Sequence, residues 1–573
     1  MLVRMLRINR LKPPPLEALA RQGAAKRAED GHPPSLMDRR HFLAHASMFL
    51  AAPAIANVLS GCSDFEINIP CLGPAAAPQP VPGMTYLKAS QIGCALNCNL
   101  KNGRNLHTGG LATDDAPRIN AAMATASDSN PITLIIDGPA LISGLFLPAG
   151  GYWNIAGLGC GTGFFVKSGT NNDGIHNGGP SAATPSNPGP PAPARGSSVS
   201  LKNFTINGNQ GNGYNGVSTS GLTQGVTNGA ASVWYFTINL MNLNNIDVEN
   251  VVLVNAPSFQ MRFSNVGNVT INGCVLRSQG ANTDGFHFDG PANDITISNC
   301  DITAGDDAIA LNCPEGYTGN IERVTVSNCT VNGWTFLIRL HTIASPNGPM
   351  FNINGVSVNN CSGNLSYAAF LVGQGSGGLP NSIDGLTVSN CIFNSPAILE
   401  IGANFGNVVL NNVTLSPLAS AQVPGFAFAR SSAFSAGCTY TGASLVLNSC
   451  IVQRKDNSPV PAVDIENGSS IGNLTFNGYT LSGGSGHSMV PALINFGSGS
   501  VAQVVINSVD SGDISAAVSS GGFASVGTVS GSGVLESGWE FPDNVMADGV
   551  PYVSATTGLP SIKVNGVVEP YPS

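Results

Sequence analysis

The sequence has few charged residues and no long apolar runs. Only 10% of its 573 residues are charged, against about 25% in an average soluble domain. This low charge, together with the scarcity of long stretches of Ala, Glu, Lys and Leu, argues against a helical or coiled-coil protein. No apolar run is long enough for a membrane span in the middle of the chain. No regular Gly period is present, which excludes a collagen-like chain.

Turn-forming and hydrophobic residues are abundant instead. The chain has 70 Gly and 38 Pro, nearly a fifth of all residues, and 42% of it is hydrophobic. A chain this apolar can bury a large core, so wholesale disorder is excluded. The composition therefore predicts a turn-rich β protein. Its length need not mean several domains, because an elongated repeat protein grows by adding repeats.

The charge is unevenly distributed along the chain. Residues 1–62 carry nine Lys and Arg against four Asp and Glu, whereas the remainder carries 15 basic and 29 acidic residues, a net charge of −14. Nucleic acid is therefore excluded as a partner, because no basic stripe is available to neutralise phosphates. A neutral or cationic substrate is easier to accommodate than a polyanion.

The N-terminal segment has the features of an export signal. Asp38-Arg39-Arg40-His41-Phe42-Leu43 precedes a weakly apolar stretch and resembles a twin-arginine signal. Leu59-Ser60-Gly61-Cys62 follows and resembles a bacterial lipobox. We therefore expect a bacterial protein that is exported and lies in the periplasm, on the outer membrane or outside the cell, with Cys62 lipidated as its anchor.

Two alternatives to this N-terminal interpretation stay open. Ala54-Ile55-Ala56 offers an ordinary signal-peptidase site, in which case Cys62 is a plain thiol. Met37 is an alternative start, because the residues before it are unusual upstream of such a signal.

The composition divides the chain into four parts. We expect the extension and export signal over 1–62, a Pro-, Ala- and Cys-rich linker over 63–104, a folded domain over 105–540 and a C-terminal tail or cap over 541–573. In an exported protein the cysteines of the linker can form disulfides, although their pairing cannot be derived from spacing. These cysteines are Cys71, Cys94 and Cys98.

A short motif repeats through the middle of the chain. It alternates apolar residues with Thr, Ser or Asn and ends on cysteine, as in Asp294-Ile-Thr-Ile-Ser-Asn-Cys300. The alternation is that of a half-buried strand, and a period in the twenties to thirties is typical of a solenoid. Successive cysteines are 26, 29, 32 and 30 residues apart at Cys274, Cys300, Cys329, Cys361 and Cys391.

These repeats predict an all-β fold, a right-handed parallel β-helix. The Asn before each Cys is suited to a tight corner, because Asn tolerates the left-handed conformation, and stacked coils would align these side chains into a ladder. We expect the cysteines to stack inward as small hydrophobic residues. Metal ligation by this column is not expected, because residues one coil apart point the same way instead of converging. Disulfides within the column are not expected either, because they would pull the coils together.

An N-terminal helical cap is expected before the first coils, because an open sheet edge invites aggregation. Thr113 is the predicted N-cap of a helix that runs through Met123, followed by strands over 133–137 and 141–147. This opening resembles the N-terminus of the pectin-lyase-like superfamily. Its pair, Asp114-Asp115, is interpreted as structural because it lies at a helix start.

Two consecutive coils carry clustered aspartates. Asn282-Thr-Asp284-Gly on one coil is followed by Gly305-Asp306-Asp307 on the next, so that Asp284 and Asp306 are 22 residues, about one short coil, apart. The three carboxylates should therefore lie on one face, one rung apart. Such crowding is costly unless they share protons or bind a cation. It is also how a general acid and a general base can be made from one residue type.

The two motifs resemble glycoside hydrolase family 28, the polygalacturonases and their relatives. The resemblance covers about residues 106–410 and implies an inverting mechanism. It implies that Asp306 is the general acid that protonates the leaving oxygen. It also implies that Asp284 and Asp307 hold and activate the attacking water.

The sequence departs from the family pattern at two places. Gly333-Trp334-Thr335 stands where the family has Gly-His-Gly, and no Arg or Lys is present over 365–374, where the family grips a galacturonate carboxylate. The resemblance therefore implies a polygalacturonase-like enzyme with an altered substrate site. Trp334 is a candidate for stacking on a sugar ring, with core or loop packing as the alternative.

Strand alternation predicts which further side chains share the outward face. His287 and Arg339 should share one outward column, with Ala310 leaving a gap between them, and His341 should lie in a second column with Asp289 and Asn312. Other outward candidates lie before and after these coils. The expected substrate contacts are His287, Arg339, His341, Asn282, Trp334 and Arg262, with Glu400 a further candidate along the helix.

Three functions compete on these grounds. The leading one is a secreted, inverting glycoside hydrolase that acts on a polysaccharide as a monomer, with no cofactor and no metal. The second is a polysaccharide lyase or epimerase, in which Arg339 or His287 abstracts a proton and the carboxylates hold Ca²⁺. The third is a non-catalytic glycan-binding β-helix.

Overall fold

The computed structural model describes residues 69–70, 73–170, 172–177, 191–209, 226–228, 231–233, 235–280, 282–313, 317–333, 335–342, 351–374, 382–416, 427–431, 439–454, 461–483, 490–510, 514–519 and 521–572. Residues 66–573 form one compact unit. The predicted export signal with Cys62, the linker residue Cys71 and the predicted stacking residue Trp334 lie outside the described residues.

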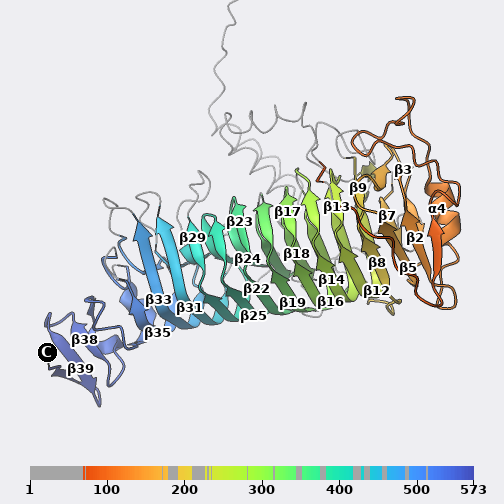
Figure 1. Cartoon of the computed structure of the whole chain (residues 1–573). Helices are drawn as coiled ribbons and strands as arrows, with labels where there is room; N and C mark the ends of the chain where they lie inside the picture. The colour runs from red at the N-terminus through yellow and green to blue at the C-terminus, as the bar shows by residue number, and fades with distance from the viewer. Residues whose placement is uncertain are drawn as a thin grey trace, which may run out of the picture. The chain divides into compact units, whose positions relative to one another are not determined.

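The compact unit is a right-handed parallel β-helix, as predicted. Each strand pairs in parallel with the strand one coil later, so the chain winds around three long sheets whose strands follow one another from orange to blue in Figure 1. We call these the first, second and third sheets.

The first sheet contains β4 (Leu145–Leu147), β7 (Ile175–Asn177), β18 (Ile309–Cys313), β21 (Ile338–Thr342), β24 (Ala368–Gln374), β27 (Ala397–Ile401), β30 (Ala427–Ser431), β32 (Val463–Ile465) and β34 (Ile494–Phe496). The second contains β1 (Thr85–Lys88), β2 (Ile132–Ile136), β5 (Trp153–Gly157), β8 (Val199–Lys202), β19 (Ile321–Ser327), β22 (Ile353–Asn359), β25 (Ser382–Ser389), β28 (Asn404–Asn411), β35 (Ser500–Val509) and β36 (Val526–Ser530). The third contains β3 (Pro139–Ile142), β6 (Gly163–Val166), β9 (Thr205–Asn207), β13 (Val252–Val254), β15 (Val275–Arg277), β17 (Asp301–Ala304), β20 (Thr330–Gly333), β23 (Ser362–Leu365), β26 (Ile392–Asn394) and β29 (Thr414–Ser416).

Five long strands bend from one sheet into the next. The first and second sheets share β12 (Ile238–Glu249), β14 (Met261–Asn272) and β16 (Phe286–Ser298), and the second and third share β31 (Thr441–Arg454) and β33 (Ser470–Gly483). The strand expected over 141–147 is divided at Gly144, whose φ of +120° turns the chain between β3 and β4.

The corner between the second and third sheets depends on asparagine, as predicted. Asn299, Asn328, Asn360 and Asn390 have φ values of 54–55°, in the left-handed region. Their side chains form part of a ladder, because Asn328 Nδ2 donates to Asn299 Oδ1 at 3.3 Å and Asn360 Nδ2 donates to Asn328 Oδ1 at 2.7 Å. These bonds connect successive coils and fix their register.

The cysteine column follows this corner and points inward. Its members are buried free thiols within the hydrophobic core, which runs along the inside of the coils: Cys274, Cys300, Cys329, Cys361, Cys391 and Cys450. In the segment predicted to be a disulfide-bearing linker, Cys94 and Cys98 are also free and buried. Cys160, which the sequence did not single out, is disulfide-bonded.

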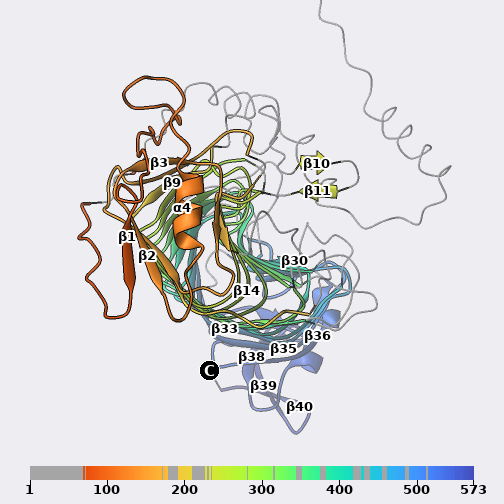
Figure 2. The same ribbon diagram turned by 90° about the vertical axis from the view of Figure 1, so that its right-hand side faces the viewer.

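The predicted helical cap is present, but its N-cap is not Thr113. Helix α4 (Ala116–Met123) begins after Asp115, and Ala116, Ile119 and Met123 are buried in the core. The N-cap prediction is wrong because Pro117 sits in the first turn and the backbone enters the helix only at Asp115. Figure 2 shows α4 across the end of the coils. The Asp114-Asp115 pair is structural here, since Asp115 accepts bonds from Ala95 N and Leu96 N.

The two ends of the solenoid differ from the expected boundaries. Strand β1, inside the predicted linker, pairs with β2, so the second sheet begins before residue 105. At the other end a separate four-stranded sheet follows β36, formed by β37 (Glu540–Phe541), β38 (Pro551–Ser554), β39 (Pro560–Val564) and β40 (Val567–Pro570). The remaining elements are the hairpin β10 (Val226–Asn228) and β11 (Ala231–Val233) and two 3-10 turns, η5 (Gly522–Ser525) and η6 (Asp543–Val545).

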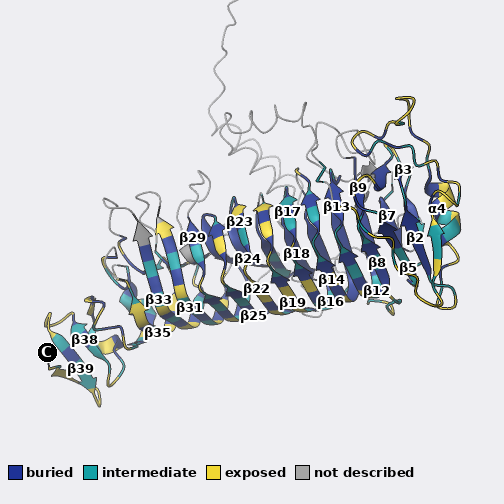
Figure 3. Ribbon diagram, viewed as in Figure 1, coloured by how far each residue is buried: buried dark blue, intermediate teal, exposed yellow. Residues whose placement is uncertain are grey.

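The first sheet is buried on both of its faces over part of its length. Strands β18 and β27 are buried at every residue, whereas β19 of the second sheet alternates between buried and more exposed positions (Figure 3). The polar side chains of β18 and β27 that point away from the core are therefore covered and require partners, while Arg339 and His341 on β21 are partly exposed. Among the described residues, no helix has the length and apolarity to cross a membrane.

Candidate active site

The predicted aspartates lie in turns that immediately precede two strands of the first sheet. Asp284 precedes β16, and Asp306 and Asp307 precede β18. The Thr283 hydroxyl joins the two turns, since it accepts from Gly305 N at 2.9 Å and donates to Gly280 O at 2.7 Å. At Gly305 a Cβ atom would lie 2.1 Å from Gly280 O, so glycine is required where the two rungs approach.

The three aspartates meet as the coil spacing predicts. One carboxylate oxygen from each of Asp284, Asp306 and Asp307 lies within 4.8 Å of the others. Asp284 and Asp307 are buried, at 0% and 1% exposure, while Asp306 is partly exposed. The cluster therefore presents one carboxyl group to the outside and keeps two beneath it.

Thr335 and Arg339 contact this cluster from the next rung. Thr335 Oγ1 lies 2.7 Å from Asp307 Oδ1 and 3.3 Å from Asp306 Oδ1. Arg339 Nη1 forms an ion pair with Asp307 Oδ2 at 3.5 Å, and its Nη2 lies 3.2 Å from His341 Nδ1. The guanidinium thus balances part of the negative charge. Thr335 was missed as a site residue, although its place at the end of Gly333-Trp334-Thr335, where the family has Gly-His-Gly, was a usable signal.

The predicted outward column is confirmed by the strand register. Arg262 on β14 pairs with His287 on β16, His287 with Ala310 on β18, and Ala310 with Arg339 on β21. The second column, with Asp289 opposite Asn312 and Asn312 opposite His341, is confirmed as well. Ala310 has no exposed surface, so the gap predicted there is not open to solvent.

His287 lies between two carboxylates and does not reach the surface. Its Nδ1 is 2.7 Å from Asp284 Oδ2, its Nε2 is 3.0 Å from Asp289 Oδ1, and the ring is 0% exposed. The Phe259 ring stacks on it with centroids 3.8 Å apart and an interplanar angle of 9°. Burial therefore places His287 beneath the surface that was expected to meet a substrate.

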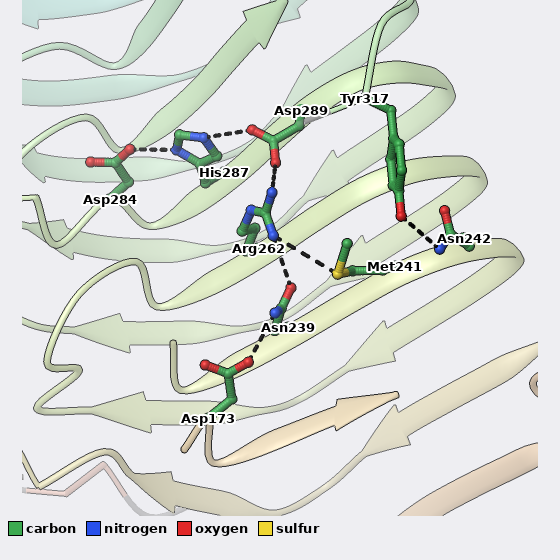
Figure 4. A network of polar contacts seen from close by, with 9 residues as sticks. All are labelled: Asp173, Asn239, Met241, Asn242, Arg262, Asp284, His287, Asp289 and Tyr317. Atoms are coloured by element: carbon green, nitrogen blue, oxygen red, sulfur yellow. Dashed lines mark hydrogen bonds and ion pairs between the residues drawn. The ribbon is translucent and has the colours of Figure 1, made fainter. Parts of the chain in front are cut away.

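Arg262 continues this buried network away from the aspartates (Figure 4). It forms an ion pair with Asp289, and its Nη1 lies 3.5 Å from Asn239 Oδ1. Asn239 Nδ2 in turn donates to Asp173 Oδ2 at 2.9 Å. Arg262 is 2% exposed, so this predicted substrate contact is also covered. Burial raises the pKa of Asp173 to about 6, partly offset by bonds from Asn239 and from Phe236 N.

The remaining candidates are divided between two places. Asn282 is 6% exposed and occupies the left-handed turn before Asp284, with a φ of 55°. Glu400 lies farther along the outward column, where it is buried and forms an ion pair with Arg430. Burial raises the pKa of Tyr367, and the charges of Glu400 and Asp306 add to that rise.

Besides Thr335, three neighbours of the candidate residues were not predicted from the sequence: Asn239, Asp173 and Phe259. Asp173 precedes Asn239 by 66 residues along the chain, and strand periodicity does not indicate that a turn residue reaches a strand one coil later. Asn239 carried a usable signal, because it occupies the same strand position as Arg262 and His287.

A cluster of three carboxylates attracts positive charge, and the described chain supplies it. His287 faces Asp284, and Arg339 faces Asp307. Among the described residues, this is the one group of three acidic, His or Cys side chains that comes this close together. Two of its members therefore already have a nitrogen partner, the Arg339 guanidinium at Asp307 and the His287 ring at Asp284.

Comparisons with known proteins support the predicted resemblance. The family described as glycosyl hydrolases family 28 matches residues 177–333, a range that contains all three aspartates. A probable polygalacturonase of Arabidopsis thaliana is 24% identical over 171 residues, which are 24% of this chain and 37% of that protein. The chain thus spans little more than a third of the length of this relative.

Solved structures share the fold at low sequence identity. A tailspike protein of E. coli bacteriophage HK620 has a TM-score of 0.50 at 10% identity, over 78% of this chain and 78% of its own. A family 28 exopolygalacturonase of Yersinia enterocolitica has a TM-score of 0.46 at 11% identity, over 75% of this chain and 79% of its own. The family 28 match and the Arabidopsis relative make the chain similar to polygalacturonase-like glycoside hydrolases, and the tailspike protein shows the parallel β-helix fold alone.

Proposed function

We propose that the protein is an inverting glycoside hydrolase that acts on a polysaccharide and differs from polygalacturonases in its substrate site. The observation that carries this proposal is the cluster of Asp284, Asp306 and Asp307, with oxygens within 4.8 Å of one another inside the range matched by family 28. A cluster of this composition can supply both a proton donor and a base for water.

The exposure of the three carboxyl groups supports a division of roles. A general acid has to meet the glycosidic oxygen, and Asp306 is the partly exposed member. The Thr335 hydroxyl has one proton, which it donates to the nearer Asp307, so its lone pair can accept a hydrogen bond from a protonated Asp306. In our proposal Asp306 gives its proton to the leaving oxygen. Water bonds to the anomeric carbon, and its proton passes to Asp284 or Asp307.

The distance between the carboxylates favours retention of the anomeric configuration, whereas their burial favours inversion. Carboxyl groups are usually about 6.5–9.5 Å apart in inverting enzymes and about 5–5.5 Å apart in retaining ones. Oxygens within 4.8 Å, taken alone, would favour retention. We propose inversion because Asp284 and Asp307 are buried, so a water molecule reaches them more easily than a sugar carbon does.

The strand that follows Arg339 supports a substrate sugar without a carboxylate. Leu371 on β24 occupies the rung after Arg339 in the outward column, and β24 has the uncharged sequence Ala-Ala-Phe-Leu-Val-Gly-Gln. A uronate carboxylate at this rung would find no cation on the strand. We therefore propose a neutral polysaccharide, or one in which the uronate is masked, as the substrate.

A polysaccharide panel assayed for new reducing ends tests the proposed function. We expect at least one neutral or esterified glycan to be cut, with full activity in EDTA and no unsaturated uronate in the products. Absorbance from an unsaturated uronate, or loss of activity in EDTA, would support a lyase instead. Binding of several glycans with no cleavage of any would support a non-catalytic β-helix.

We also propose that the protein is exported as a monomer and anchored through a lipid on Cys62. The support is the twin-arginine-like and lipobox-like sequence over 38–62. Replacement Cys62→Ser is expected to move the exported protein from the membrane fraction to the soluble fraction, and gel filtration of that variant should give the mass of one chain. A membrane-bound Cys62→Ser protein would contradict the anchor.

A further inference from the structure

His287 occupies an unusual place, since both of its ring nitrogens face carboxylates in a fully buried setting. Nδ1 is 2.7 Å from Asp284 and Nε2 is 3.0 Å from Asp289. Ionised carboxylates only accept hydrogen bonds. A neutral imidazole has one N–H, so one of its nitrogens would present a lone pair to a carboxylate. An imidazolium has two N–H groups and satisfies both.

The charges around the ring favour the same form. On β14, Arg262 pairs with Asp289, so that among the described residues His287 is the basic side chain that faces Asp284. On the other side β18 contributes Ala310, which is uncharged, while the turn before it contributes Asp306 and Asp307. The Phe259 ring covers one face of the imidazole and adds no charge. A positive ring is therefore stabilised by acidic groups on the side of the aspartates.

Asp284 has two oxygens with different surroundings. Oδ2 is held by His287, whereas Oδ1 is buried and, among the described residues, has no hydrogen-bond partner. A buried carboxylate oxygen without a partner is costly. A water molecule held at Oδ1 for attack would satisfy it. His287 therefore fixes the orientation of the Asp284 carboxylate, and with it the direction in which Oδ1 points.

We propose that His287 is an imidazolium that positions Asp284, so that Asp284 Oδ1 faces the attacking water. This inference rests on the proposed function for its catalytic consequence, but the charge of His287 does not depend on it. His287 is a positioning residue here, because its ring is buried beneath the carboxylates and meets no substrate atom.

The buried network behind His287 holds it in place. Asp289 binds the second ring nitrogen, and Arg262 pairs with Asp289. Asn239 contacts Arg262 and donates to Asp173, which completes the row of contacts from His287 to Asp173 in Figure 4. The row crosses three neighbouring strands, β16, β14 and β12, so its members keep their spacing through the sheet register. Rotation of the imidazole would break bonds at both ends.

His176 provides an internal control in the same outward column. It pairs in register with Asn239, packs edge-on against Phe146 at 5.0 Å, and its buried Nε2 has no hydrogen-bond partner among the described residues. Burial lowers the pKa of His176 to about 4. Of these two buried histidines in one column, His287 should therefore be positively charged at neutral pH and His176 neutral.

Nitrogen NMR of the full chain labelled with ¹⁵N-histidine tests the charge directly. At pH 8 we expect one histidine whose two ring nitrogens both carry protons and whose signals disappear in His287→Gln. His176, assigned with His176→Gln, should be neutral. If every histidine is neutral at pH 8, the proposal is overturned, and this spectrum needs only the wild-type protein.

Kinetics on the best substrate tests the positioning role. Replacement His287→Gln should lower kcat by about 10²-fold with little change in KM, because the base is misplaced rather than removed. Asp289→Asn should lower kcat less and shift the acidic limb of the pH–rate profile in the same direction as His287→Gln. His176→Gln is the matched control and should keep kcat.

The outcomes separate this inference from the proposed function. If wild type cuts a glycan and both His287→Gln and Asp289→Asn keep its kcat and pH profile, His287 has no positioning role, while the hydrolase assignment stands. If wild type cuts nothing but the imidazolium signal is present, the hydrolase assignment fails and the charge assignment stands. If His287→Gln does not fold, Asp289→Asn and the wild-type spectrum still decide.

Discussion

One outward column of the first sheet runs through two regions with different consequences. Near the aspartates it contains Arg262, His287 and Arg339, and farther along it contains Glu400 and Arg430, followed by Asp464 and Asn495 on the next strands. Both regions are polar, and both contain buried side chains, Arg262 and His287 in the first and Glu400 and Arg430 in the second.

The two regions differ in where their charges lead. In the distant region Glu400 pairs with Arg430, and Asn495 donates to Asp464 at 2.8 Å, so the contacts run from strand to strand within the column. Near the aspartates the contacts leave the column, from His287 to Asp284 and from Arg339 to Asp307, both in turns. A buried charged row alone is therefore structural. The column becomes a candidate site where its side chains contact the turn carboxylates Asp284 and Asp307, which lie beside the partly exposed Asp306.

The largest expected effect is the loss of the exposed carboxyl group. Asp306→Asn should lower kcat by about 10³–10⁴-fold, because it removes the proposed proton donor. Asp464→Asn changes a carboxylate of the distant region and is the matched control, with kcat unchanged. Initial rates of reducing-end release measure both. Full activity of Asp306→Asn would remove this residue from the mechanism.

The next effect concerns stability in the distant region. Arg430→Met removes a cation from the buried Glu400 carboxylate and should lower the free energy of unfolding by about 3–5 kcal/mol. The double variant Glu400→Gln/Arg430→Met should recover most of that loss, because no buried charge is left unpaired. Urea denaturation followed by fluorescence measures the free energy of unfolding of both variants. The folded fraction of each should keep its activity. A stable Arg430→Met protein with low activity would mean that the two regions are not distinct.

Asp173, at the far end of the row behind His287, predicts a dependence of stability on pH. Its pKa rises from 3.8 to about 6 on burial, so folding favours the protonated form. The stability it contributes is present below about pH 4 and is lost as the pH rises through about 6, a change of up to about 3 kcal/mol. The decrease in melting temperature between pH 4 and pH 7 should therefore be smaller in Asp173→Asn than in wild type. Asp128→Asn, at an exposed position, should match wild type; identical slopes for all three proteins would refute this role.

The smallest effect concerns a corner that belongs to neither region. Asn360→Ala removes a ladder hydrogen bond at a φ of 55° and should cost about 1–2 kcal/mol of unfolding free energy. Asn394→Ala removes one ladder bond, to Asn364, without that left-handed conformation and should cost less. Calorimetry compares the two. Equal losses would show that the corner conformation contributes nothing.

Much of this organisation could be predicted from the sequence, because it follows from local periodicity. Repeats ending in Asn-Cys predict the coils, the left-handed corner and the inward cysteines. Strand alternation alone placed His287, Ala310 and Arg339 in one column. The spacing of Asp284 and Asp306 by one coil brought their carboxylates together, since neighbouring rungs are joined by ladder hydrogen bonds.

The rest depends on contacts between residues far apart in the chain. Arg195 reaches Asn265 at 3.0 Å and Asn293 at 2.6 Å, so a segment before β8 packs beside strands that follow it by 70 residues or more. Such packing decides whether a column faces solvent, and no periodicity encodes it. His287 and Arg262 were expected at the surface although they are buried, because alternation does not show that the Phe259 ring stacks on His287 and that the centroid of the Phe236 ring lies 5.3 Å from the Arg262 guanidinium carbon. The N-cap of α4 was misplaced because Thr113 and Asp115 are both suitable residues, and only the path of the chain selects one.

The stereochemistry of cleavage tests the central claim most directly. Proton NMR of the anomeric region, recorded during the first minutes of hydrolysis of the best substrate, identifies the anomer released before mutarotation. The proposed roles of Asp306 as acid and of Asp284 and Asp307 as holders of water predict the anomer opposite to that of the cleaved linkage. Release of the same anomer as in the substrate would contradict them, because one of the buried carboxylates would then have to attack the sugar itself.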